Sequence, residues 1–375
     1  MIRDSRFTKL KSLAMELFDV AIVGCGPAGS TCAAFCAAAG LRTLVLEREQ
    51  FPREKVCGDC LNPACWPVLR RLGLADLGRA SPHGKLEGVE FIAIGGQTVH
   101  VDLPPGDESE IAIKRSLFDN LLFTRARELG AEIRDSTVVR AIEKNSSRHW
   151  RLAAGETILE AAILVGADGR NSTVARLSNL LPRPERERVA LQTHIPLPRK
   201  FGNRVVLQFL PEGYSGQAPV NENELNLCLV GRPPTISSLR RWAERNFGIA
   251  TDHAWRTITP LTRAPVSAVH ENLFFIGDAA RVVEPFTGEG IYYALRSGEL
   301  AANAIVKIIR GQDRQVSLRE FDRAHAAMYR GRLRINRLAR AAVLSPRIAS
   351  LFVSAARIDS SILKLLTAKI VRPPL

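Results

Sequence analysis

A glycine-rich turn between a predicted strand and a predicted helix constrains the fold of this chain more than any other stretch. Residues 18–23 form a short apolar run with β-branched side chains, which is typical of a buried parallel strand. Gly24, Gly26 and Gly29 follow at once, in the spacing G-x-G-x-x-G. Residues 30–39 are small and rich in alanine, and they predict a helix. This order of strand, turn and helix indicates the start of a βαβ unit.

The spacing of the glycines indicates what this unit binds. Gly24 permits a tight turn, Gly26 lets the backbone approach a pyrophosphate, and Gly29 lets the helix pack closely on the strand. The phosphates would lie at the helix N-terminus, where free N–H groups and the helix dipole favour anions. Residues 42–46 predict a second strand, and the Glu47 that follows is placed to bind ribose hydroxyls. We therefore predict a dinucleotide-binding unit at the start of the fold.

The composition narrows the class of protein. The chain has 375 residues, of which 46% are hydrophobic, and this is enough for two packed units. Its seven cysteines are an odd number, which does not suit a secreted disulfide framework and favours a reducing compartment. The first residues lack the apolar segment of a signal peptide, and no run of about eighteen apolar residues predicts a spanning helix. We expect a soluble, cytoplasmic protein.

The net charge of +14 is concentrated at the two ends of the chain. Residues 1–14 hold four Lys or Arg and one Asp, and residues 329–375 hold ten Lys or Arg and one Asp, giving +3 and +9. We expect a flexible extension at 1–14 and a basic helical region at 313–375. These ends fit either attraction to an anionic membrane surface, with the protein peripheral to it, or a solvated helix face. No nucleic-acid-binding motif accompanies the charge, so no nucleic-acid partner is expected.

The order of predicted elements indicates a mixed α/β (α+β) chain with two units. A β-meander at 137–159 interrupts the α/β pattern, antiparallel strands begin near 189, and the α/β pattern returns near Asn272. We expect a Rossmann-type domain with an inserted β-meander, a second domain with an antiparallel sheet for the substrate, and a C-terminal helical region. The first domain would take residues 15–75, 108–188 and 265–312, and the second would take 76–107 and 189–264.

Several element boundaries can also be predicted. Ser116 is a candidate N-cap for a helix that ends before Gly130. Residues 157–159 and 162–165 predict two separate strands, and a long helix is expected to begin near Thr287.

Two further motifs follow the glycine turn. One is G-A-D-G-R-N-S-T-V-A-R at residues 166–176, and the other is F-F-I-G-D-A-A at 274–280, continued by P-F-T-G-E-G-I at 285–291. Together with the glycine turn, this set resembles the FAD-dependent oxidoreductases of the p-hydroxybenzoate hydroxylase fold, and it is most similar to their geranylgeranyl reductase family. The resemblance covers about residues 16–310 and implies that the dinucleotide is FAD.

The resemblance assigns particular residues to the cofactor. Asp278 would accept hydrogen bonds from ribityl or ribose hydroxyls, although an Asp after a strand also serves as a cap. The helix expected to open at 285–290 would stabilise negative charge at the pyrimidine edge of the flavin. Arg115 matches a position where Arg meets the cofactor, or it is a surface charge at a helix start. The residues expected to bind FAD are Gly24, Gly26, Pro27, Ala28, Gly29, Glu47, Arg48, Lys55, Arg115, Asp168, Gly277, Asp278, Pro285, Gly288, Gly290 and Ile291.

The loop K-V-C-G-D-C at residues 55–60 is similar to a K-x-C-G-G loop of the geranylgeranyl reductases. The resemblance places Cys57 and Gly58 beside the flavin and the substrate, and we expect both to be catalytic. Asp59 departs from the pattern, because it replaces the second glycine. Cys60 completes a C-x-x-C, so a redox pair is an alternative, but the chain has no second pair for a zinc site and no metal is expected.

The stretch at 213–219 is the counterpart of an aromatic motif in related enzymes. It lacks the tryptophans of the halogenase motif W-x-W-x-I-P, so halogenation is not expected. Tyr214 and Pro219 fit the geranylgeranyl reductase version loosely. We expect Tyr214 to be a third residue of the catalytic site that lines the substrate pocket; the alternative is a packed tyrosine at a strand turn.

The resemblance implies an FAD-dependent oxidoreductase that reduces carbon–carbon double bonds of a lipophilic, prenyl- or polyene-like substrate. Hydride would come from reduced flavin, and Cys57 or a nearby water would assist protonation. One alternative is an NAD(P)H-dependent monooxygenase that hydroxylates or epoxidises an aromatic or polyene substrate, and another is a non-catalytic, membrane-associated flavin protein. Because the chain has a single complete G-x-G-x-x-G, NADPH or NADH would bind only transiently.

Overall fold

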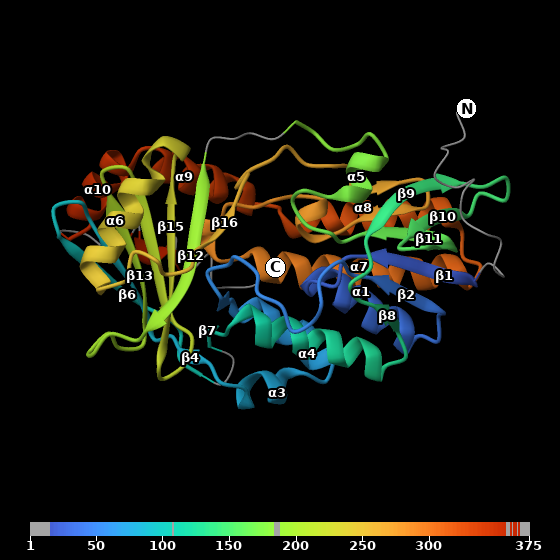
Figure 1. Cartoon of the computed structure of the whole chain (residues 1–375), viewed down its shortest axis with the longest axis horizontal. Helices are drawn as coiled ribbons and strands as arrows, with labels where there is room; N and C mark the ends of the chain where they lie inside the picture. The colour runs from blue at the N-terminus through green and yellow to red at the C-terminus, as the bar shows by residue number, and fades with distance from the viewer. Residues whose placement is uncertain are drawn as a thin grey trace.

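The strand before the glycine turn, β1 (Glu16–Val23), lies inside an eight-stranded sheet. The computed structural model describes residues 16–106, 109–183, 188–357, 361, 363–365 and 367, so the extension predicted at 1–14 lies outside the described residues. Figure 1 shows this sheet at one end of an elongated molecule and a second large sheet at the other end. The expected mixed α/β fold with two sheets is confirmed, while the exact domain boundaries stay a prediction.

The first sheet combines a parallel core with an antiparallel meander. β1 pairs in parallel with β11 on one side and with β2 on the other. β10 and β9 extend the sheet from β11 in antiparallel pairing, which confirms the inserted meander. The remaining strands of this sheet are β2 (Thr43–Leu46), β8 (Glu132–Arg134), β9 (Val139–Lys144), β10 (Trp150–Ala154), β11 (Thr157–Gly166), β17 (Val269–His270) and β18 (Leu273–Phe275).

One strand of the meander is longer than predicted. Residues 157–159 and 162–165 belong to the single strand β11, so the prediction of two strands was wrong. The reason is its pairing: β1 matches β11 from Glu16 opposite Leu159 to Val23 opposite Gly166. A continuous partner strand keeps β11 extended through the residues between the two apolar runs.

Three helices begin at other residues than the sequence predicted. α1 (Pro27–Ala38) starts at a proline, whose fixed φ suits the first turn of a helix. α4 (Arg115–Glu128) has Lys114 at its N-cap position, so Ser116 is not the cap. α7 (Gly290–Ile309) starts after Thr287, because residues 285–287 form a separate 3₁₀ turn and Gly288 follows with a φ of 67°.

The helices α1 and α7 pack against each other at unusually close range. A Cβ added to Gly298 of α7 would lie 2.4 Å from the backbone oxygen of Ala28 in α1. The small residues of α1 make this approach possible, and α8 (Arg314–Met328) packs on α7 in turn. Buried side chains of α1, α4 and α7 form one core with one face of the first sheet.

The second sheet has seven strands and is antiparallel except at one pair. β13 pairs in parallel with β5, so the predicted antiparallel sheet contains one parallel step. β14, which the sequence suggested only as a turn region, is a full strand between β13 and β15. The strands are β5 (Gly88–Ile92), β6 (Thr98–Asp102), β12 (Val189–Pro196), β13 (Arg204–Leu210), β14 (Gly213–Pro219), β15 (Glu224–Gly231) and β16 (Arg256–Ile258).

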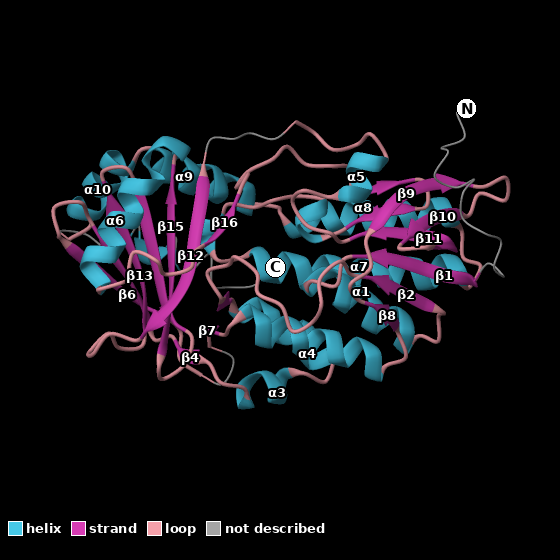
Figure 2. Ribbon diagram, in the orientation of Figure 1, coloured by secondary structure: helices cyan, strands magenta, loops and turns pink. Residues whose placement is uncertain are grey.

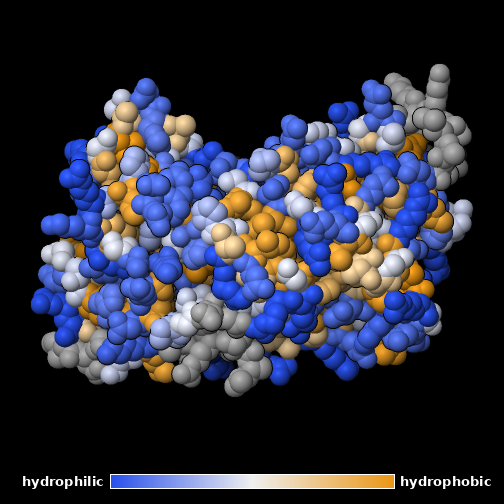
Figure 3. All heavy atoms as spheres, turned by 90° about the horizontal axis from the view of Figure 1, so that it is seen from below, coloured by the Kyte–Doolittle hydropathy of each residue, from blue (hydrophilic) through white to orange (hydrophobic). Residues whose placement is uncertain are grey.

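Helices cover both faces of the second sheet. α6 (Ile236–Phe247) packs on one face, and α10 (Pro346–Ala355) packs on the other, preceded by α9 (Arg332–Leu344). In Figure 2 the strands gather in two groups with α4 and α7 between them. On the face in Figure 3, hydrophobic residues gather near the middle, between the two lobes. No helix in the described part of the chain is both long and apolar enough to cross a membrane.

Short elements join the two sheets. A small three-stranded sheet contains β3 (Cys60–Leu61), β4 (Gly84–Lys85) and β7 (Ile111–Ala112). The short helices are α2 (Trp66–Arg71), α3 (Ala75–Ala80) and α5 (Thr173–Leu177). β3 directly follows the Cys57 loop, so its pairing with β7 fixes the end of that loop beside α4.

The contact between α1 and α7 gives a test of the fold. We expect Gly298→Ala to lower the free energy of unfolding by about 1–3 kcal/mol, because the added methyl group meets the α1 backbone. Gly78→Ala in α3 is the matched control, since its Cβ would meet only Trp66 at an ordinary 3.5 Å. There we expect no loss and a gain of up to about 1 kcal/mol from helix propensity. Urea unfolding of both variants measures the difference, and equal stability would contradict the packing argument.

Candidate functional site

The glycine turn has the geometry of a phosphate site. A Cβ on Gly29 would lie 1.9 Å from the oxygen of Gly24, so the turn closes only with glycine there. A Cβ on Gly26 would meet only the Arg53 guanidinium at 3.5 Å, so the backbone of Gly26 stays approachable. The N-terminus of α1, at Pro27 and Ala28, has no capping side chain and no acidic residue in its first turn. Its N–H groups are available to an anion.

Glu47 is held at the end of β2 by backbone groups. Its carboxylate accepts hydrogen bonds from the N–H of Cys25 at 2.7 Å and of Glu49 at 3.0 Å. The side chain is buried, and the Arg53 guanidinium lies 4.0 Å away. This places the acid where the sequence predicted it, at the edge of the glycine turn. The Arg48 side chain, unlike that of Glu47, is exposed: it is 70% accessible and pairs with Glu49.

Arg115 lies inside the molecule and not on its surface. Its guanidinium donates two hydrogen bonds to Asp119, at 2.7 and 2.9 Å, and Asp119 also accepts one from Arg53 at 3.1 Å. Burial acts to lower the pKa of Arg115, but the Asp119 carboxylate and the Cys57 sulfur outweigh it and raise the pKa. Arg115 therefore stays charged beside the Cys57 loop.

Lys55 lies among several of these charges. Burial, together with the nearby cations Arg115, Arg170 and Arg53, lowers the pKa of its ammonium from 10.5 to about 8. Asp278 opposes that effect. The surroundings of Lys55 thus bring together the glycine-turn side, α4 and the Asp278 motif. A cluster of cations with few anions suits an anionic ligand.

Asp278 and Asp168 lie at the carboxyl ends of neighbouring strands. The Asp278 carboxylate accepts a hydrogen bond from Arg170 at 3.0 Å and is 30% exposed, so it remains open to a ligand. Asp168 caps α5, because its carboxylate accepts from the N–H groups of Thr173 and Val174. Its second oxygen is buried without a partner in the described structure. Burial raises the pKa of Asp168 despite these hydrogen bonds.

The Asp278 motif leads into the N-terminus of α7. Gly277 donates its N–H to Ser297 at 2.9 Å, which fixes the motif on α7. Pro285 begins the 3₁₀ turn, and α7 opens at Gly290 and Ile291 without a capping side chain. Glu289, at the N-cap position, pairs with Arg332 at 2.8 Å, so its charge is balanced. The helix N-terminus can therefore still favour an anionic group.

The Cys57 loop is fixed against the second sheet. The Cys57 carbonyl accepts hydrogen bonds from Asn226 at 2.9 Å and from the Cys228 thiol at 3.3 Å, both on β15. Burial raises the pKa of the Cys57 thiol, and Arg115 acts against this rise. Cys57 and Cys60 are both free, and Gly58 has open space around its Cα. The loop thus lies between Arg115 of α4 and β15 of the second sheet.

Tyr214 lies on β14 next to the turn that precedes α7. Its ring makes an edge contact with the Phe286 ring, and the two centroids are 5.3 Å apart. The Phe286 ring also lies near Phe209, with centroids 5.9 Å apart. The tyrosine is buried in an apolar cluster under α10. It is therefore a packed side chain, and it lies near Gly288 at the junction of the two sheets.

Several charged residues of this site were not predicted from the sequence. Asp119 stands four residues after Arg115 on a predicted helix, a spacing that could have indicated the pair. Arg53 had no such local signal, whereas Arg170 lies inside the G-A-D-G-R motif that begins at Gly166. Glu110 lies near Gly288, and burial alone raises the pKa of its carboxyl to about 7.

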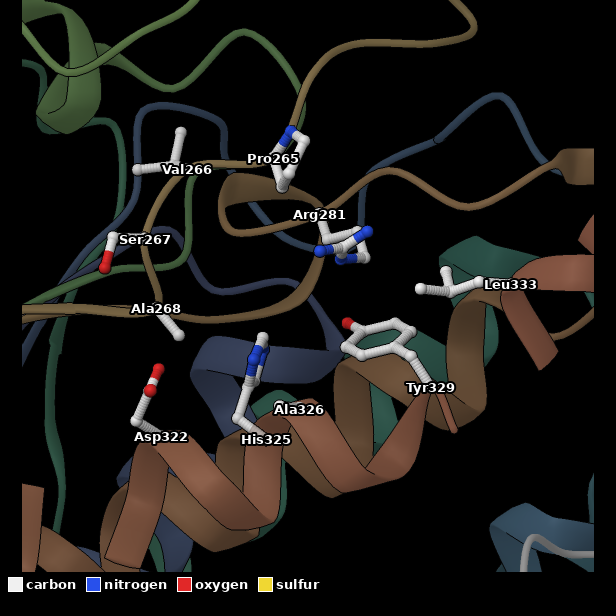
Figure 4. Close-up of a pocket in the computed structure, with 10 residues that line it drawn as sticks. All are labelled: Pro265, Val266, Ser267, Ala268, Arg281, Asp322, His325, Ala326, Tyr329 and Leu333. Atoms are coloured by element: carbon white, nitrogen blue, oxygen red, sulfur yellow. The ribbon is translucent and has the colours of Figure 1, made fainter. Parts of the chain in front are cut away.

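A separate cavity of about 280 Å³ lies between residues 265–268, Arg281 and α8. Figure 4 shows His325 of α8 and Tyr329, which directly follows that helix, beside the cavity, with Arg281 opposite. Arg281 lies 5.1 Å from the centre of the Tyr329 ring. Burial, helped by Arg281, lowers the pKa of His325 to about 4, so this imidazole is neutral near pH 7. None of the predicted site residues lines this cavity.

Comparisons with known proteins agree with this geometry. A family model described as FAD binding domain matches residues 17–195. Menaquinone reductase of Mycolicibacterium smegmatis is 31% identical over 315 residues, which cover 76% of this chain and 75% of that protein. Digeranylgeranylglycerophospholipid reductase of Methanosphaerula palustris is 28% identical and covers 81% of this chain and 80% of its own.

Two further proteins match this chain over only part of their length or at low identity. Conditioned medium factor receptor 1 of Dictyostelium discoideum is 26% identical over 80% of this chain, and the chain spans 65% of that protein. The structure of the flavin-dependent brominase Bmp2 triple mutant has a TM-score of 0.77, covers 95% of both chains and is 21% identical, which shows the fold alone. The family match and the menaquinone reductase relative show that this chain is an oxidoreductase: it belongs to the FAD-dependent oxidoreductases of the p-hydroxybenzoate hydroxylase fold, and its relatives include geranylgeranyl reductases.

Proposed function

We propose that this protein reduces carbon–carbon double bonds of a lipophilic, prenyl- or polyene-like substrate. The observation that carries the proposal is the position of the Cys57 loop, which lies between Arg115 and β15 at the junction of the two sheets. Relatives named menaquinone reductase and digeranylgeranylglycerophospholipid reductase support a lipid substrate with prenyl chains.

The residues of the glycine turn and of the two later motifs fit FAD. The open backbone at Gly26 and the uncapped start of α1 would hold the pyrophosphate, and Glu47 and Asp278 would accept hydrogen bonds from hydroxyl groups. The start of α7 at Gly290 would lie at the flavin ring. When bound and reduced, FAD supplies hydride to the substrate from its N5 atom.

Cys57 would supply the proton that the reduction also needs. Hydride adds to one carbon of the double bond, and the electron pair left on the other carbon must take up a proton. Burial raises the pKa of the Cys57 thiol, so at neutral pH the group is protonated and is a proton donor, not a nucleophile. The thiol itself, or a water beside it, would protonate that carbon.

The apolar half of the second sheet would hold the substrate chain. Tyr214, Phe209 and Phe286 form one aromatic group beneath α10, next to the start of α7. Tyr214 and Phe209 are buried in this group, so a prenyl chain would meet the group at the half-buried Phe286. NADPH or NADH would reduce the flavin by binding transiently, since the sequence has one complete dinucleotide fingerprint.

We further propose that α10 attaches the protein to an anionic membrane. Its outer side exposes Leu351 and Phe352 by 70% and 67%, while Val353 is buried against the second sheet. Arg347 and Arg357 flank the exposed residues, and large apolar groups beside cations fit the interface of anionic lipids. A peripheral position would let a lipid pass from the bilayer to the sheet under α10. All seven cysteines are free, which fits the cytoplasmic side.

A reduction experiment without oxygen tests the enzymatic proposal. We expect photoreduced, FAD-loaded protein to be reoxidised by a polyprenyl lipid that has no quinone ring, such as a geranylgeranyl ether lipid, with a product heavier by two hydrogens in mass spectra. Cys57→Ala should slow this reoxidation by about 100-fold, because the proton donor is lost, and Cys60→Ala is the matched control. Reoxidation by oxygen alone, with NADPH consumption and release of hydrogen peroxide, would contradict reduction and support the monooxygenase.

The pKa of Lys55 predicts how pH affects cofactor binding. The ammonium is charged below about pH 8 and neutral above it, and only the charged form attracts the anionic cofactor. We expect the Kd for FAD to rise roughly fivefold between about pH 7 and 9. Quenching of flavin fluorescence measures this Kd. Lys55→Met should remove the pH dependence, whereas Lys85→Met, an exposed lysine, should keep it; an unchanged profile in Lys55→Met would exclude this role.

Vesicle binding tests the membrane proposal. We expect the double variant Leu351→Ser, Phe352→Ser to bind vesicles of phosphatidylglycerol and phosphatidylcholine about tenfold more weakly than the unchanged protein. Leu77→Ser removes a residue of similar exposure on α3 and should have no effect. Sedimentation with vesicles gives the bound fraction. Equal losses in both variants, or equal binding to neutral vesicles, would argue against attachment through α10.

A further inference from the structure

Asp59 stands where the related loop has glycine, and its backbone explains that glycine. Its φ is 61°, in the left-handed region that glycine adopts without strain and Asp tolerates better than most residues. An aspartate in this position needs a compensating interaction, because its side chain is fully buried.

The compensating partner is His194 on β12. The Asp59 carboxylate lies 2.7 Å from Nε2 of His194, across 135 residues of sequence. Burial acts to raise the pKa of Asp59, while the hydrogen bond and the charge of His194 act to lower it. The imidazole is itself largely buried. The loop and the second sheet are thus joined through an acid and an imidazole.

Two further side chains of the second sheet, Asn226 and Gln192, connect His194 to Cys57. Asn226 donates from Nδ2 to the Cys57 carbonyl, so its Oδ1 faces the other way and accepts from Gln192 Nε2 at 3.1 Å. The Gln192 amide lies 3.4 Å from the His194 ring nitrogen Nε2. A series of contacts therefore leads from Asp59 through His194, Gln192 and Asn226 to Cys57. Because Cys57 and Asp59 are two positions apart in one loop, these contacts hold both ends of that short segment.

We propose that Asp59 and His194 are a positioning pair that holds the Cys57 loop against β12 and β15. The pair does not touch the Cys57 thiol, and it acts through the backbone of the loop. The related loop has a flexible glycine at this position, whereas here the contact between Asp59 and His194 restrains the loop. The role of Cys57 in the reaction rests on the proposed function, but the anchoring of its loop does not.

The labelling rate of the Cys57 thiol tests this pair without substrate. In FAD-loaded protein treated with N-ethylmaleimide, peptide mass spectra give the rate at each cysteine. We expect Asp59→Gly, which suits the left-handed backbone, to raise the Cys57 rate about tenfold by freeing the loop. His194→Ala should raise it equally, and the double variant should add nothing more, because both act through one contact.

Two variants distinguish anchoring from a general loss of stability. Asp59→Asn keeps an acceptor for His194 and tolerates the backbone, so it should retain the slow rate. His253→Ala removes a histidine that contacts Thr193 on β12 and should leave Cys57 unchanged. Unchanged labelling in Asp59→Gly and His194→Ala, or equal acceleration at the buried Cys32 and Cys36, would overturn the proposal. If anchoring holds but no lipid is reduced, only the proposed function fails.

Discussion

The close approach of backbones around the glycine turn is the constraint on which the rest of the structure depends. Gly29 lets α1 begin directly against the backbone of Gly24. Gly298 lets α7 cross α1 so closely that an added Cβ atom would overlap the α1 backbone. These contacts bring the N-termini of α1 and α7 to the carboxyl edge of the first sheet, where both have free N–H groups. One cofactor can then meet two helix dipoles, one at each of its anionic parts.

Charge is arranged around this edge in a way that supports a long anionic ligand. Lys55, Arg53, Arg115 and Arg170 converge on it, and Asp119 holds Arg53 and Arg115 in place through hydrogen bonds. Burial is the main reason why the pKa of the Lys55 ammonium is lowered, and the neighbouring cations add to this effect. A bound dianion would reverse that effect, so cofactor binding and the protonation of Lys55 are linked.

The inner face of the second sheet has a polar part and an apolar part. Its β12 and β15 side is polar and holds the Cys57 loop through Asn226 and His194, whereas Tyr214 of β14 belongs to an apolar cluster with side chains of β13 and α10. Under the proposed function, the first part would hold the loop of the proton donor, and the second would lie beside the hydrocarbon chain. A protein that reduces a lipid needs both, because the double bond must stay in place while the chain remains mobile.

The sequence by itself determined the glycine turn, the central strands and the order of the FAD motifs, because these depend on local spacing and hydrophobic period. It misplaced the start of α7 and divided β11, because a 3₁₀ turn and a partner strand decided those boundaries. Only the tertiary structure joined Asp59 to His194 and placed Arg115 between Asp119 and Cys57. A contact between residues that are far apart in sequence leaves no local pattern, so folding alone brings such pairs together.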